Sequence, residues 1–217
     1  MDFICHNHRF ALDIVESNSE LKSLWEEVVS SISSISESQL IEEFSASQNK
    51  MSLSDAINKL LDEELVKRSW IPQSAIFQGK EYREKKWKLD FSKKISKPDK
   101  GITGMAIEVA FNHGEAIAWN LMKPVLAAEL SQVELETEIG AGIGVYICAS
   151  SELKSAGAFD GAVGEYEKVL RYLTPMYQKL TAPLIIVGLN APKSFRVEKR
   201  MNAITHRNRG VIVKKLD

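Results

Sequence analysis

The sequence has little cysteine and no long hydrophobic run, and both shortages exclude classes of protein. Cys5 and Cys148 are the only cysteines in 217 residues, too few for a disulfide framework and without zinc-site spacing. No stretch reaches the roughly 18 consecutive apolar residues of a membrane span. The first residues lack the basic and apolar regions of a secretory signal. We therefore expect one soluble domain over residues 1–217, in a reducing, cytoplasmic setting.

Motifs of common metabolic enzymes are also missing. The sequence has no internal repeat, and no nucleophile with an accompanying base stands out. The glycines at 140, 142 and 144 are not followed by the phosphate-binding helix of a dinucleotide fingerprint. A metabolic α/β enzyme is therefore a function that the sequence supports only weakly.

Charge is unevenly distributed along a chain whose net charge is −1. Residues 80–100 carry 9 basic and 4 acidic side chains, and residues 195–217 carry 7 and 2. The remaining segments are acidic. Two basic blocks on an acidic chain suit a polyanion held at one face, although lysine-rich loops can also be merely solvated.

The first third of the chain has the pattern of helices. Apolar residues recur at helical spacing from Leu21 to Val29 and from Ala56 to Leu65, with Ser52 or Ser54 as the expected N-cap of the second helix. The charged residues 80–104 predict mostly loop, with a short strand at 87–91. We expect a helical part at 1–72, a core at about 73–192 and a basic tail at 193–217.

The second half alternates strands and helices. Apolar runs at 105–111, 142–148 and 182–189 predict buried strands, and helices are expected at 115–130, where Pro124 would kink the helix, and at 160–180. This order indicates an α/β protein with a central mixed sheet flanked by helices.

Glu108 is the most informative residue of the apolar run at 105–111. An ionised carboxylate is costly in a packed sheet unless a cation or hydrogen bonds compensate it. Together with Asp90 it could bind Mg²⁺, which prefers oxygen ligands and activates water. The alternative is that Glu108 lies at a sheet edge and pairs with a lysine.

Three segments resemble type II restriction endonucleases of the BglII, BstYI and BamHI group, a branch of the PD-(D/E)XK nucleases. The first runs from Asn58 to Val66 and is followed by Trp70. The second combines Asp90-Phe91-Ser92-Lys93 with residues 106–111, Ala-Ile-Glu-Val-Ala-Phe. The third comprises residues 182–189 and 207–213. The matches run in order over roughly residues 50–215.

The resemblance implies a restriction-endonuclease-like (PD-(D/E)XK) core and assigns roles to residues. Asp90 and Glu108 would be the catalytic carboxylates that bind Mg²⁺, and Asn58 would help to position the attacking water. Hydrolysis would leave 5′-phosphates. The protein would act as a homodimer on a palindrome, since two-fold symmetry of the protein matches that of the site. The helix after Glu108 and the helix at 160–180 resemble the dimer-forming elements.

Two features depart from the family pattern. Glu108 lies eighteen positions after Asp90, and Asp99 within the intervening basic segment is a rival metal ligand. The second departure is Ala110, at a catalytic position where the family has lysine, glutamate or glutamine. Alanine can contact neither metal nor water, so Asn58, Glu115 or another side chain supplies the missing group, or the enzyme is weak or disabled.

Several residues are candidates for DNA contact. Asn112 and His113 follow the catalytic strand and could read base edges, or they simply form a turn. Ser155 could offer a contact before the long helix, or lie in an ordinary loop. Lys93 and Lys94 are expected to clamp the phosphate backbone. The basic tail would wrap DNA, or be merely solvated. Its candidate residues are Arg196, Lys199, Arg200, His206, Arg207 and Arg209.

The resemblance thus predicts a Mg²⁺-dependent endonuclease that cuts double-stranded DNA at a short palindrome, with a GATC-centred hexamer as the first candidate. A DNA methyltransferase is expected in the same system, without direct contact. The alternative is a DNA-binding protein on the same scaffold that cuts weakly or not at all.

Overall fold

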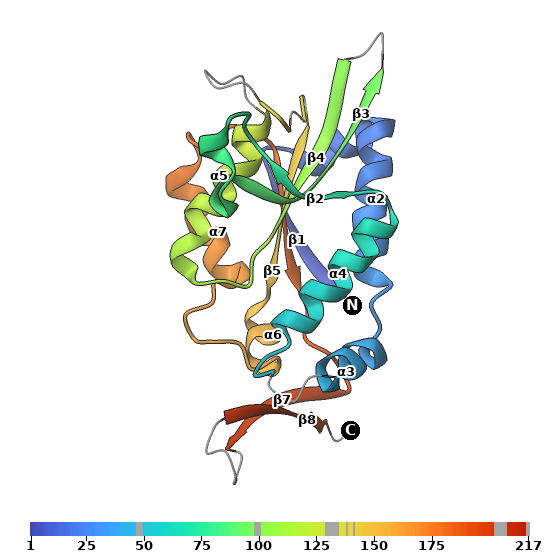
Figure 1. Cartoon of the computed structure of the whole chain (residues 1–217), viewed down its shortest axis with the longest axis vertical. Helices are drawn as coiled ribbons and strands as arrows, with labels where there is room; N and C mark the ends of the chain where they lie inside the picture. Colours follow the sequence, from blue (N-terminus) through green and yellow to red (C-terminus); the bar gives the residue numbers. More distant parts are fainter. Residues whose placement is uncertain are drawn as a thin grey trace.

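The protein has a six-stranded mixed sheet between two helical layers (Figure 1). The computed structural model describes residues 1–46, 50–97, 101–128, 135–137, 139–140, 142–201 and 208–215. In spatial order the strands are β1 (Phe3–His8), β6 (Leu184–Leu189), β5 (Ile143–Ala149), β4 (Gly101–Val109), β3 (Lys88–Lys97) and β2 (Ile71–Ala75). β4, β5 and β6 are parallel, and the other pairs are antiparallel. This architecture confirms the predicted α/β class.

The two helical layers bury opposite faces of the sheet. One layer contains α1 (Ala11–Ser17), α2 (Ser19–Ser33), α3 (Glu37–Ser45) and α4 (Ser54–Lys67). The other contains α5 (Ile117–Ala128) and α7 (Tyr166–Met176). Every residue of β5 and β6 is buried, as expected for parallel strands covered on both sides. Figure 1 shows α2 and α4 on one side of the sheet and α5 and α7 on the other.

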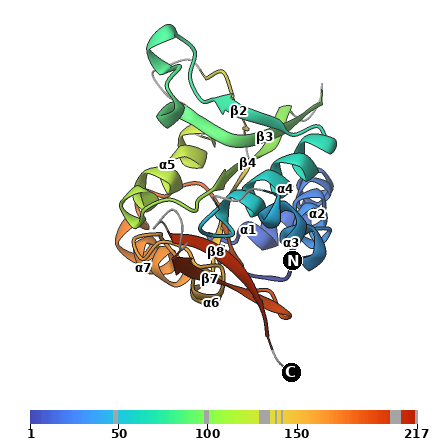
Figure 2. The ribbon, with the colours of Figure 1, turned by 60° about the horizontal axis from the view of Figure 1, so that its bottom comes forward.

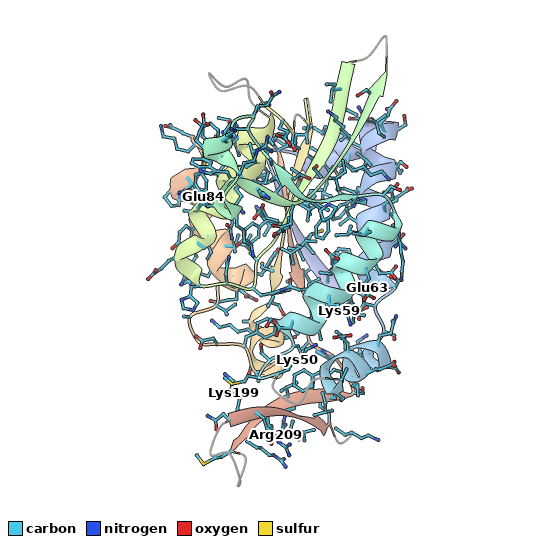
Figure 3. The ribbon with its side chains drawn as sticks, in the orientation of Figure 1. Lys50, Lys59, Glu63, Glu84, Lys199 and Arg209 are labelled. Atoms are coloured by element: carbon cyan, nitrogen blue, oxygen red, sulfur yellow. The ribbon has the colours of Figure 1, made fainter. Side chains whose placement is uncertain are left out.

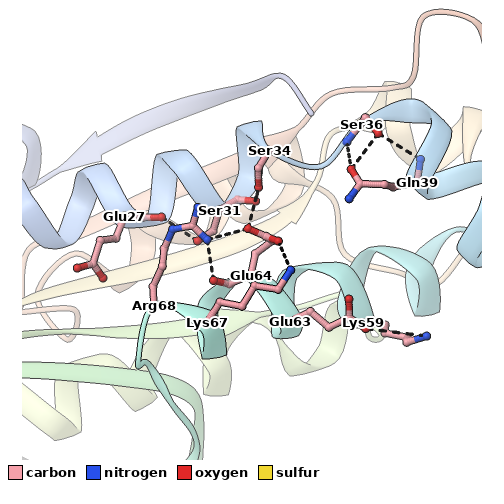
Figure 4. Close-up of polar contacts among 10 residues, drawn as sticks. All are labelled: Glu27, Ser31, Ser34, Ser36, Gln39, Lys59, Glu63, Glu64, Lys67 and Arg68. Atoms are coloured by element: carbon pink, nitrogen blue, oxygen red, sulfur yellow. Dashed lines mark hydrogen bonds and ion pairs between the residues drawn. The ribbon is translucent and has the colours of Figure 1, made fainter.

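Polar contacts join the ends of α2 and α4 (Figure 4). The Glu64 carboxylate on α4 accepts hydrogen bonds from Ser34, Lys67 and Arg68. At the other end of α2, Asn18 accepts hydrogen bonds from two main-chain N–H groups of the first turn. α4 itself lacks the expected serine cap, because its N-cap residue is Leu53, and the flanking hydroxyls of Ser52 and Ser54 bond to each other at 2.8 Å.

The expectation that residues 80–104 form mostly loop is wrong. Two 3₁₀ turns, η1 (Lys80–Tyr82) and η2 (Lys85–Trp87), are followed by the long hairpin of β3 and β4. The charge of this segment is tolerated because Lys94 and Ser96 are exposed on one face of β3, whereas Phe91 is buried and Ile95 half-buried on the other. Alternation between a solvated and a packed face is compatible with a strand of high charge.

Two other elements differ from the sequence-based expectation. The N-terminal residues form β1, an edge strand that pairs with β6. α7 is shorter than expected because residues 157–165 form turns after the short helix α6 (Ser151–Ala156). Pro124 lies inside α5, as expected. No helix within the described ranges is long and apolar enough to cross a membrane.

The basic tail folds as a hairpin of β7 (Phe195–Met201) and β8 (Asn208–Lys214), a separate two-stranded sheet. Figure 2 shows it crossing one end of the molecule near α6 and α3. Phe195 and Val197 are buried against the body of the protein. Gly210 allows close approach to α3, since an added Cβ would lie 2.6 Å from Phe44 Cζ. Apolar packing therefore anchors this basic segment.

Candidate active site

Asp90 and Glu108 lie side by side on β3 and β4. The main-chain pairing of these strands extends to Phe91 and Ile107. At the adjoining residues, carboxylates bind the neighbouring strand instead. The Asp90 N–H donates to Glu108 Oε1 at 3.3 Å, and the Val109 N–H donates to Asp90 Oδ2 at 2.8 Å. These bonds hold the two candidate metal ligands together.

Glu108 is almost completely buried and contacts a lysine. Its exposed fraction is 1%, and Lys123 Nζ on α5 donates to Glu108 Oε2 at 2.7 Å. Burial raises the pKa of Glu108 to about 8, and the charge of Asp90 acts in the same direction, whereas Lys123 opposes the rise. The carboxylate therefore both faces a second carboxylate and pairs with a lysine. β4, the strand that carries Glu108, lies between β5 and β3 and is not an edge strand.

A second buried polar pair lies beside the first. Tyr146 occupies the position on β5 that is in register with Glu108, and it is hydrogen-bonded to Asn120. Asn120 lies three residues before Lys123 on α5 and donates to Asn112 Oδ1 at 3.4 Å. These hydrogen bonds link residues beside Glu108 to the turn that follows β4.

Ala110 contributes only packing to this site. It is 2% exposed and belongs to the apolar cluster that contains Ile117 and Leu121. Its N–H donates to Ile147 O at 2.8 Å. Its methyl group cannot bind a metal or orient water, as expected from the sequence. Lys123 contacts Glu108 here, whereas Glu115, one of the residues predicted to supply the missing group, is exposed.

A cleft of about 340 Å³ along β2 and β3 is connected to Asp90 through Gln73. Gln73 lines the cleft, and its Nε2 donates to Asp90 Oδ1 at 3.3 Å. Its φ of 50° is unusual for a residue other than glycine. Lys88 and Lys94 also line the cleft. Positive charge therefore lies along a groove that leads to the carboxylates.

Lys93, a predicted clamp of the DNA backbone, makes three contacts within the protein. Its Nζ donates to both carboxylate oxygens of Glu27 at 2.8 Å and to Arg68 O at 2.7 Å. An ammonium group has three N–H donors, and these contacts join β3 to α2 and to the end of α4. The side chain is therefore occupied within the protein, and the predicted phosphate contact would have to replace one of these partners.

Asn112 and His113 lie in a turn whose main chain is fixed and whose side chains are exposed. Gly164 N donates to Asn112 O, and Gly114 N donates to Ala162 O. The pKa of neighbouring Asp160 is lowered first by the hydrogen bond from the Ala162 N–H and then by the charges of His113 and Lys199. The turn after β4, the 160–164 loop and β7 thus meet on one surface.

The hairpin distributes its cations over two faces. Arg196 and Arg200 both bind Glu198, at 2.7 and 3.0 Å, and Arg200 is in register with Arg209. Since side chains alternate along a strand, Lys199 lies on the opposite face, the same face as the buried Phe195 and Val197. Figure 3 labels Lys199 and Arg209 on this hairpin and Lys50 on the segment that precedes α4. The arginines remain exposed.

The other predicted residues make no described hydrogen bond to Asp90 or Glu108. Ser155 is exposed on α6, which packs against β7. Asn58 is exposed on α4, and no hydrogen bond described within the resolved ranges joins it to Asp90 or Glu108. Asp99, His206 and Arg207 lie outside the described residues.

Lys123 and Asn120 were not predicted from the sequence, although a signal for them exists. In the segment 117–125, apolar residues mark the buried helix face at 117, 121 and 125. Asn120 and Lys123 lie on or beside that face, where polar residues need partners. A buried carboxylate on a preceding strand was the available partner.

Comparison with known proteins identifies the family. The family model for restriction endonuclease BglII/BglIII matches residues 3–189. A crystal structure of restriction endonuclease BglII complexed with a DNA 16-mer superposes with a TM-score of 0.60 at 17% sequence identity, covering 99% of this chain and 100% of that one. A structure of free BglII covers the same shares, with 15% identity and a TM-score of 0.45. No match was found among curated proteins. The chain belongs to the BglII/BglIII family of type II restriction endonucleases.

Proposed function

We propose that this protein hydrolyses double-stranded DNA at a short palindrome in a Mg²⁺-dependent reaction that leaves 5′-phosphates. The supporting observation is the mutual hydrogen bonding of Asp90 and Glu108 with each other's strands, in a chain of a restriction endonuclease family. A GATC-centred hexamer is the first candidate site, on the basis of family resemblance.

The donor set fits Mg²⁺. Both candidate ligands are carboxylates, and Mg²⁺ is typically bound by one or two carboxylates while it keeps several waters. No group of three or more His, Cys, Asp or Glu that could hold a metal occurs among the described residues. The charge of Asp90 raises the pKa of Glu108, and a cation placed beside both carboxylates would offset this repulsion. When bound, the ion would polarise the phosphodiester and lower the pKa of the attacking water.

The chain's own residues would hold this site and its DNA. Gln73 and the two strands orient the carboxylates, and Lys94 on the cleft wall is positioned for a phosphate. The structurally similar BglII was crystallised with DNA. We infer that DNA lies over the surface where the cleft, the 112–113 turn and the hairpin present polar groups.

Asn112 and His113 are the proposed base-reading residues. Their side chains are exposed while the main chain of their turn is bonded to the 160–164 loop. A rigid turn with exposed amide and imidazole groups can donate to and accept from base edges. Ser155 and Lys199 would contribute from the adjoining α6 and β7.

Arg196, Arg200 and Arg209 are proposed to bind phosphates. All three are exposed on the hairpin, where the only acidic neighbour described in contact with them is Glu198. Arg207, outside the described residues, is also proposed as a phosphate contact. Asn58 is proposed to act on the attacking water in the DNA-bound protein.

The active form would be a homodimer, with each subunit cutting one strand. A palindrome presents the same half-site twice, which a two-fold dimer matches. We propose α5 and α7 as the interface elements. Light scattering of the DNA complex should give two chains per duplex. A DNA methyltransferase of the same specificity is expected in the same system.

Incubation with a long sequenced DNA, with Mg²⁺ and with chelator, tests the proposed reaction. Discrete metal-dependent fragments with 5′-phosphate ends at one palindrome are expected. Ala110 favours a second candidate, a protein that binds the site without cutting it. Intact DNA in both Mg²⁺ and Mn²⁺ with salt-sensitive binding to one duplex would support that alternative.

A further inference from the structure

We propose that Lys123 of α5 supplies the charged catalytic side chain that position 110 lacks, so that Asp90, Glu108 and Lys123 form the reactive group. The assignment rests on the proposed nuclease function. It is carried by two observations, the 2.7 Å contact of Lys123 Nζ with Glu108 Oε2 and the alanine at position 110.

The helix is packed so that Lys123 reaches the carboxylate. Pro124 follows directly and lies against Gly144 of β5, where an added Cβ would be 2.6 Å from Pro124 Cβ. The absence of a side chain at Gly144 lets α5 approach the sheet at this turn. Lys123 is consequently 7% exposed, and its ammonium group reaches a strand residue 15 positions earlier in the chain.

A purely structural role explains this pair less well. Lysine is almost never fully buried without a partner, and a buried ion pair contributes little net stability compared with apolar residues of similar volume. Apart from Asn120, the buried residues of α5 near Lys123 are apolar, with Leu121 and Val125 completely buried. A charge retained in such a position is expected to serve chemistry at the carboxylate that it contacts.

The contact also leaves Lys123 able to act on substrate. An ammonium group carries three N–H donors, and the hydrogen bonds described for Lys123 use one, to Glu108. The others can donate to a non-bridging phosphate oxygen or to the attacking water. A fixed positive charge at that place stabilises the charge that develops on the phosphate. The bond to Oε2 meanwhile orients Glu108.

The test compares Lys123→Met, Lys123→Gln and Lys123→Arg with wild type on the mapped DNA site. Lys50→Met is the matched control, since Lys50, on the α3–α4 connection, makes a similar 2.8 Å pair with Glu43 of α3. Single-turnover rate constants are measured up to saturating Mg²⁺, and DNA affinity is measured in Ca²⁺. At saturating Mg²⁺ we expect Lys123→Met to be about 100-fold slower, with DNA affinity within about threefold of wild type and Lys123→Arg partly active.

Three outcomes would overturn the assignment. If Lys123→Met regains the wild-type rate at saturating Mg²⁺, the lysine only neutralises Glu108. If Lys123→Met does not fold, Lys123→Gln takes its place, and full activity of that variant would contradict the assignment. If the wild-type protein does not cleave DNA, the proposed function is overturned, and the role assigned to Lys123 with it. If the wild type cleaves and the Lys123 variants are equally active, only the role of Lys123 is overturned.

Discussion

Asp90 and Glu108 each bind the main chain of the strand that carries the other. Asp90 N–H donates to Glu108 Oε1, and Asp90 Oδ2 accepts from Val109, the residue after Glu108. Two carboxylates are thereby held close together, with the Lys123 ammonium on one side. We expect this arrangement to favour cation binding at the cost of stability, a trade-off common at functional sites.

Neutralising one carboxylate should stabilise the metal-free protein. Asp90→Asn removes the like charge beside Glu108 but keeps an oxygen for the Val109 N–H. We expect its melting temperature at pH 8 without divalent metal to equal or exceed that of wild type by a few degrees, because repulsion is relieved. Calorimetric scans measure this, and Asp62→Asn, exposed on α4, is the control. A large fall in melting temperature would mean that Asp90 is primarily structural.

Metal binding should depend on pH through Glu108. Its pKa is raised to about 8, chiefly by burial, so the protonated carboxyl must lose a proton before it binds metal. Affinity for Mn²⁺ should therefore rise by up to about tenfold per pH unit below pH 8 and level off above it. Titration calorimetry in buffers of different ionisation enthalpy would detect the released proton. Affinity that does not change between pH 6 and 9 would contradict this prediction.

The hairpin arginines should bind DNA in a salt-dependent manner. Arg196→Ala and Arg200→Ala are each expected to weaken binding to all sequences alike and to reduce the slope of log K against log salt by about 1. Lys22→Ala on α2, an exposed lysine in an ion pair with Glu16, is the control. Fluorescence anisotropy in Ca²⁺ at several salt concentrations provides the data. An unchanged slope in both arginine variants would exclude the hairpin from the phosphate-binding surface.

Acid stability should depend on Glu64. Hydrogen bonds from Lys67 and Arg68 lower its pKa from 4.5 to about 2. A carboxyl with a lowered folded-state pKa stabilises the protein above pH 4.5, and this contribution is lost as pH falls from about 4.5 to about 2. Glu64→Gln should therefore cost at most about 1 kcal/mol at pH 7, and less than half of that at pH 3. Urea unfolding at both pH values measures the difference, and an equal cost at both would refute the prediction.

The sequence predicted the layers of the fold but not the course of its charged segments. Apolar runs at 142–148 and 182–189 are read correctly as buried strands because parallel strands are covered on both sides. The lysine-rich sequence of β3 led to the prediction of a loop. The partner of Lys93 is Glu27, 66 positions away, so no local sequence pattern indicates this contact. The C-terminal hairpin was missed because its anchoring residues, Phe195 and Val197, are few.

For the candidate site, resemblance supplied Asp90 and Glu108, and the structure places them together. It could not supply Lys123, because the contact depends on how closely α5 approaches the sheet at Gly144. The contact of Gln73 with Asp90 could likewise not be predicted, because it requires an unusual backbone conformation in an edge strand. Side chains that meet through tertiary packing leave weak traces in a single sequence.

Single-turnover cleavage of the mapped DNA site by wild type, Asp90→Asn and Glu108→Gln tests the central claim most directly. The account predicts that wild type cuts in Mg²⁺, whereas both variants lose at least about 100-fold in rate while they bind the same duplex in Ca²⁺ within about threefold of wild type. Cleavage at the wild-type rate by either variant would show that the hydrolytic centre lies elsewhere and would contradict the account.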